Sequence, residues 1–93
     1  MSAERKALKH WIKTLAGRQM DMAAARAAEK EIPIEEFLSK TYRSTLGEMR
    51  AEQVIEDLLT AHPELEAVYP TLYAEAVAEL RDERETTAEV KSS

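Results

Sequence analysis

The chain has 93 residues, a net charge of −5 at pH 7, and a composition that is 44% hydrophobic and 33% charged. It has no cysteine, two glycines and three prolines, which excludes a disulfide scaffold, a thiol nucleophile and a collagen-like chain. No apolar run approaches membrane-spanning length and the N-terminus has no signal-peptide pattern, so we expect a cytoplasmic protein. Because 15 of the hydrophobic residues are Ala, the core of a monomer would be thin, and the length excludes a large enzyme.

The first third of the chain predicts two helices. Over residues 3–16, large apolar residues recur at the three- and four-residue intervals of one helical face: Leu8, Trp11, Ile12 and Leu15. We expect Gly17 to end this helix as a left-handed cap. A second helix over residues 21–31 would begin at Asp21 as N-cap; its many alanines favour helix but add little bulk.

The middle of the chain predicts two further helices, over residues 33–46 and 48–61. Pro33 suits a first helical turn, and Gly47 marks either a stop or a kink. The predicted inward face of the first comprises Ile34, Phe37, Leu38, Thr41 and Leu46, with Tyr42 at the edge of the core. That of the second comprises Ala51, Val54, Ile55, Leu58 and Leu59. Pro63 is expected to end this helix.

A short turn over residues 63–68 precedes a last predicted helix over residues 70–85. Its inward positions are Tyr73, Ala76, Val77 and Leu80. Residues 86–93 lack a periodic pattern, and we expect them to form a frayed or disordered tail. No stretch alternates with period two, so no sheet is expected. The predicted fold is all-α: a single domain over residues 1–85, built as a small compact bundle of four to five helices with short connections.

Charge is distributed unevenly along the chain. Residues 1–30 carry a net charge of +4, and residues 31–93 carry −9. A basic stripe on the first helix contains Lys6, Lys9 and Lys13, and an acidic stripe on the last contains Glu75, Glu79, Asp82 and Glu83. Like charges four residues apart cost about 0.2–0.5 kcal/mol per pair, so an opposite charge is expected nearby. Both stripes are candidate protein-binding residues, and the sequence leaves open whether they are solvated, pair with each other or meet a partner.

No pattern of catalytic, cofactor-binding or metal-binding residues is apparent. The two isolated glycines cannot form a phosphate-binding loop, and there is no nucleophile elbow or paired-histidine zinc motif. His10 and His62 are far apart in sequence, and neither has a second His at helical spacing. We therefore predict a non-enzymatic protein without a cofactor or metal.

A helix-turn-helix-like unit over residues 22–46 gives a second interpretation. Its candidate DNA-contacting residues are Ser39, Lys40, Arg43 and Ser44. Two acids, Glu35 and Glu36, stand at the start of the helix that would enter the groove, where they repel phosphates. Together with the negative net charge, this ranks nucleic acid behind a protein partner. The acidic body of the chain also argues against binding to anionic membranes.

The sequence therefore predicts a small protein-interaction module: a regulator, adaptor or inhibitor that docks a charge-polarised helical surface on another protein. A DNA-binding regulator is the first alternative. A structural homo-oligomer is the second, because dimerisation would bury more apolar surface than the thin core of one chain.

Overall fold

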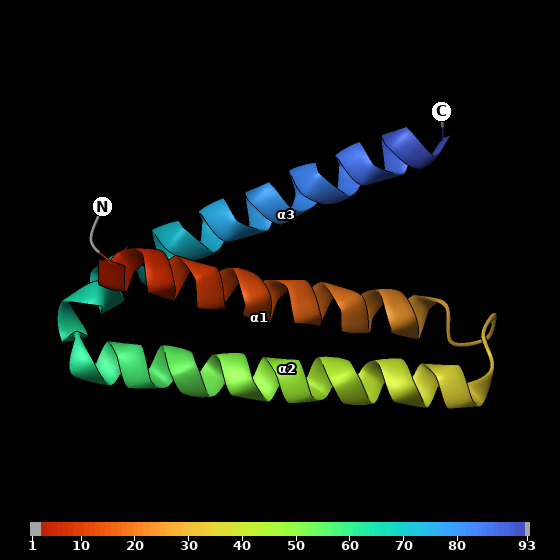
Figure 1. The fold of residues 1–93 in the computed structure, drawn as a ribbon, viewed down its shortest axis with the longest axis horizontal. Coiled ribbons are helices and arrows are strands. Elements are labelled where there is room, and N and C mark those ends of the chain that lie inside the picture. The colour runs from red at the N-terminus through yellow and green to blue at the C-terminus, as the bar shows by residue number, and fades with distance from the viewer. Residues whose placement is uncertain (1–2, 93) are drawn as a thin grey trace.

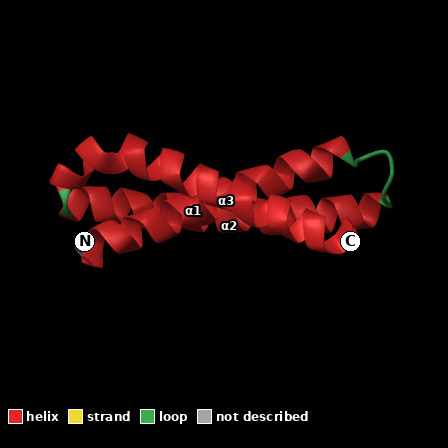
Figure 2. Ribbon diagram, turned by 90° about the horizontal axis from the view of Figure 1, so that it is seen from above, coloured by secondary structure: helices red, strands yellow, loops and turns green. Residues whose placement is uncertain are grey.

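The computed structural model describes the backbone of residues 3–92 and the side chains of residues 3–85. This part contains α1 (Ala3–Ala27), α2 (Ile34–Ala61), the 3₁₀ helix η1 (Pro63–Val68) and α3 (Tyr69–Ser92), and no strand. Figure 1 shows that α1 and α2 form an antiparallel hairpin, and that α3 runs in the direction of α1 and diverges from it toward its C-terminal end. Figure 2 shows helices joined by short connections. The prediction of an all-α protein is confirmed.

The predicted number of helices is wrong, because α1 and α2 each continue through an expected break. Neither Gly17 nor Gly47 has a positive φ, so neither is the cap that would end a helix. A glycine inside a helix costs about 1 kcal/mol relative to Ala, and tertiary packing overrides this cost. Gly17 lies against Leu80 of α3, and Gly47 lies against the side chain of Arg18. The two long helices thus replace four shorter predicted ones.

Of the other predicted helix boundaries, the one at Asp21 is wrong and the one before Pro63 is confirmed. Asp21 lies inside α1 and accepts a hydrogen bond from Arg84 of α3 at 2.9 Å, instead of capping a helix. The break before Pro63 is confirmed: α2 ends at Ala61, and the N–H of His62 donates to the carbonyl of Leu58. The predicted tail over residues 86–93 lies outside the part whose side chains are described.

The main core lies where all four helical elements meet. It is formed by Leu8, Ile12, Leu15, Ala51, Ile55, Leu65, Leu72 and Ala76. Leu8 and Ile12 are fully buried, and Trp11 packs against the cluster. The predicted inward positions of α1 and of the second half of α2 therefore supply this core. Leu65 and Leu72 were not predicted as core residues; they come from η1 and the first turn of α3.

The first half of α2 keeps only part of the predicted inward face, since Phe37 and Thr41 are half-buried and the other positions are exposed. Five large apolar side chains on it, here called the α2 apolar stripe, are between 49% and 67% exposed: Ile34, Leu38, Tyr42, Leu46 and Met49. Ile34, Leu38 and Leu46 were expected to face inward, and Tyr42 to edge the core. Where this half of α2 meets α1, the buried side chains are small: Ser44 of α2 and Ala25 of α1. Small side chains let the two helices approach closely, and they leave the larger ones outside.

The molecule is elongated, whereas a compact bundle was expected. Its extents are 45 × 31 × 17 Å and its radius of gyration is 15.3 Å, compared with about 12 Å for a compact domain of this length. No helix in the described part of the chain is long and apolar enough to cross a membrane.

Candidate functional site

The basic and acidic stripes predicted from sequence meet each other. Lys9 Nζ lies 3.0 Å from Glu79 Oε1 and 3.5 Å from Glu75 Oε2, and Lys13 forms an ion pair with Glu83. The hydrogen bond to Glu79 raises the pKa of Lys9 above its ordinary value of 10.5, and the charges of Glu79 and Glu75 add to this effect. The two stripes hold α3 beside α1.

The remaining two residues of these stripes are Lys6 and Asp82. Both are exposed, and neither belongs to the ion pairs between α1 and α3. The paired lysines and glutamates are already neutralised within the chain, so a partner would have to displace an existing contact to bind them. That Lys6, Lys9, Lys13, Glu75, Glu79, Asp82 and Glu83 bind a partner stays a prediction.

The four candidate DNA-contacting residues do not share one exposed surface. Ser44 is 5% exposed and faces α1, and Lys40 pairs with Glu36 at 3.1 Å. Lys40 and Arg43 border a recess between α1 and α2, whereas Ser39 lines a separate depression beside Tyr42. Residues 22–46 form the closed end of a long antiparallel hairpin (Figure 1), in place of two short helices at the steep angle of a helix-turn-helix.

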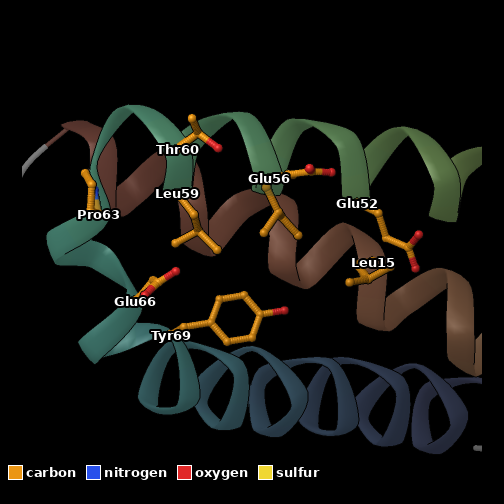
Figure 3. A pocket seen from close by; sticks show the side chains of 9 residues that line it. Leu15, Glu52, Glu56, Leu59, Thr60, Pro63, Glu66 and Tyr69 are labelled. Carbon is orange, nitrogen blue, oxygen red and sulfur yellow. The ribbon is translucent and has the colours of Figure 1, made fainter.

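An open groove of about 450 Å³ lies between α2 and α3, with α1 behind it (Figure 3). We call it the α2–α3 groove. Its apolar lining comes from all four helical elements: Leu15, Ile55, Leu59, Pro63 and Tyr69. Its polar lining comprises Glu52, Glu56, Thr60 and Glu66. The groove exists because α3 packs on α1 and barely touches α2, so the space beside α2 stays uncovered.

The α2–α3 groove is negatively charged. No Lys, Arg or His lines it, and among the described side chains none forms an ion pair with Glu52, Glu56 or Glu66. Burial raises the pKa of the Tyr69 hydroxyl above 10.0, and the neighbouring Tyr73 and the charge of Glu52 act in the same direction. The rings of Tyr69 and Tyr73 stack at 6.4 Å, which fixes the wall of the groove on the α3 side.

Sequence reasoning missed the three groove glutamates. Glu52 and Glu56 stand four residues apart on α2, the same like-charge spacing that identified Glu75 and Glu79 on α3. Both glutamate pairs have this spacing in the sequence, and only the tertiary structure distinguishes them. The acids of α3 face the lysines of α1, whereas those of α2 face an open groove without a cation.

The histidines sit apart from both surfaces. His10 stacks edge-on against Trp11 at 5.4 Å, and His62 Nδ1 lies 3.6 Å from Glu64 at the start of η1. Within the described residues, no three side chains of the metal-ligating types come together. The α2–α3 groove offers apolar surface for aliphatic or aromatic groups and carboxylates for cations.

No protein family, curated protein or solved structure matches this chain.

Proposed function

We propose that the chain is a non-enzymatic, cytoplasmic protein-interaction module that binds a basic amphipathic helix of another protein in the α2–α3 groove. One observation carries this proposal: an apolar groove whose charged residues are all acidic and have no ion-pair partner among the described side chains. Amphipathic helices commonly bind by placing an apolar face in such a groove.

The charges of the rest of the chain support this assignment. The lysines of α1 that could neutralise an acidic surface are already engaged with α3. Unpaired carboxylates at the edge of an apolar surface attract cationic groups, speed their association, and discriminate against acidic segments. A partner helix with Leu on one face and Lys or Arg beside it satisfies both parts of the groove.

Binding of a designed probe tests the proposal. The probe is a labelled 15-residue helical peptide with Leu on one face and Lys on the other, and its control carries Glu in place of Lys. Fluorescence anisotropy should show binding of the Lys peptide only, with an affinity that falls as salt rises. Three neutralisations, Glu52→Gln, Glu56→Gln and Glu66→Gln, should together weaken binding about tenfold, since each exposed pair contributes up to about 1 kcal/mol.

The matched control is Glu64→Gln, which removes a carboxylate of η1 that does not line the groove. It should leave the affinity for the Lys peptide unchanged. Equal binding of the Lys and Glu peptides, or equal effects of the triple and control variants, would contradict the proposal.

A further inference from the structure

The α2 apolar stripe is a second unpartnered surface, and it shares no residue with the α2–α3 groove. Its five side chains are spaced four, four, four and three residues apart, so they form one continuous face. The face spans 15 residue steps, or about 22 Å of helix. Contiguous exposed apolar surface of this size marks an interaction site.

The spacing of the stripe is symmetric about Tyr42 to within one residue. Leu38 and Leu46 stand four residues before and after Tyr42, and Ile34 and Met49 stand eight before and seven after it. A two-fold axis through Tyr42 therefore superposes the pattern on itself when two helices run antiparallel. Each leucine of one copy then meets the opposite leucine of the other, which is the requirement of a self-complementary interface.

The charges beside the stripe favour the antiparallel arrangement. Glu35 and Arg50 lie on the same flank of α2, seven residues before and eight residues after Tyr42. An antiparallel pair brings Glu35 of each copy within one residue step of the level of Arg50 of the other, so opposite charges lie beside each other across the interface. The other flank carries Thr41 and Thr45 near the axis, so no like charges meet there.

The shape of the surface also fits a second copy. Small residues beside Tyr42 leave a depression of about 550 Å³, lined by Leu38, Ser39, Thr41, Tyr42 and Thr45. A large side chain of a second copy can enter this depression in the manner of a knob in a hole. Two stripes packed together bury roughly 1,000 Å², close to the lower limit of specific interfaces.

We propose that two copies of this chain form a dimer through the α2 apolar stripe, with the two α2 helices antiparallel about a two-fold axis at Tyr42. The dimer covers the side chains that the monomer leaves in water. The partner in the α2–α3 groove is a different protein, so each proposal can fail without the other.

Oligomeric state gives the first test. Sedimentation equilibrium of the intact chain should show a dimer at tens of micromolar, and Leu38→Glu should raise its dissociation constant at least tenfold. Leu38 is exposed, so circular dichroism should show that the variant keeps its helices. The control is Thr71→Glu, which adds the same charge at an exposed position in the first turn of α3, and it should remain dimeric. A monomer at 200 µM would overturn the proposal.

Single cysteines give the second test, because the chain contains none. Under oxidation, Tyr42→Cys should form a covalent dimer, since residue 42 meets its own copy at the axis. Ile34→Cys should not crosslink to itself, but it should crosslink to Met49→Cys in a mixture. Self-crosslinking of Ile34→Cys would overturn the antiparallel arrangement, as would failure of Tyr42→Cys to crosslink.

Charge exchange gives the third test. Glu35→Arg and Arg50→Glu should each weaken the dimer, and the double exchange should restore it. Arg50 also lies over the Trp11 ring at 5.9 Å. If Arg50→Glu weakened the dimer only by breaking this contact within one chain, the added Glu35→Arg change would not restore the dimer. Absence of restoration would contradict the register.

Discussion

The two ends of the α1–α2 hairpin are built from helices of similar length and pattern, and they differ in what covers them. At the core end, η1 and α3 close over the hairpin, and the apolar side chains of both helices are buried. At the hairpin end, around the connection between Ala27 and Ile34, α3 has diverged and only two helices remain (Figure 1). The α2 apolar stripe lies there and is exposed to solvent.

The difference shows that the periodic spacing of apolar residues does not determine whether that helical face is buried or exposed. Two helices in contact can bury only the residues between them, and a second stripe needs a third element. Leu8 and Leu38 have the same side chain in equally good helical patterns, and one is fully buried whereas the other is 57% exposed. The uncovered end is therefore where the chain can acquire a binding surface.

The largest expected effect is at the core end. Ile12→Ala removes a fully buried side chain and leaves a cavity, which should lower the free energy of unfolding by about 2–5 kcal/mol. Leu38→Ala should change it by less than about 0.5 kcal/mol when the chain is dilute enough to be monomeric. Urea denaturation followed by circular dichroism measures both. Losses of similar size in dilute solution would contradict the contrast between the ends.

The next effect distinguishes the two glycines. Gly17→Ala should stabilise the chain by about 0.5–1 kcal/mol, because the new Cβ would lie 3.7 Å from Leu80, an ordinary contact. At Gly47 the same Cβ would lie 2.7 Å from Nε of Arg18, so the side chain of Arg18 must move and the gain should be smaller or lost. Thermal unfolding of both variants checks this order, and a larger gain at Gly47 would contradict it.

A smaller loss of stability is expected from removing the contact between α3 and the middle of α1. Arg84 donates to Asp21 at 2.9 Å and to the carbonyl of Gly17 at 3.3 Å. Because both side chains are more than two-fifths exposed, Arg84→Ala should cost only about 0.2–1 kcal/mol. Hydrogen exchange should become faster in α3 while the α1–α2 turn is unaffected. The control, Arg81→Ala, removes an exposed Arg of α3 that does not contact Asp21, and it should leave exchange unchanged.

The smallest effect is a loss of stability at high pH. The pKa of Lys9 is raised in the folded chain, so its contribution is complete below pH 10.5 and is lost as the pH rises through the folded value. The pKa of Tyr69 is raised too, so the folded state resists its ionisation and loses stability from about pH 10 upward. Urea midpoints between pH 9 and 11.5 should fall less steeply for Tyr69→Phe. Tyr42→Phe, at the hairpin end, is the control and should follow the parent chain.

The sequence predicted much of the core and little of the candidate site. The spacing of Leu8, Ile12 and Leu15 identified the buried face of α1, because a third element covers that part of the helix. The same reasoning failed for Leu38 and Leu46, because nothing in their spacing states whether a third helix reaches them. The groove glutamates were missed because helical spacing shows which acids are neighbours along one helix, and it does not show which cations other helices bring to them.

The sequence by itself determined that this protein is all-α, where its main break at Pro63 falls, and that opposite charges lie on its first and last helices. These properties follow from backbone propensity, periodicity and charge, which act over a few residues. Only the tertiary structure decided that α1 and α2 run through their glycines, that the lysines of α1 neutralise the acids of α3, and which apolar stripe stays outside. Those outcomes depend on how three long helices share a limited contact surface, and α3 can cover only one end of the hairpin.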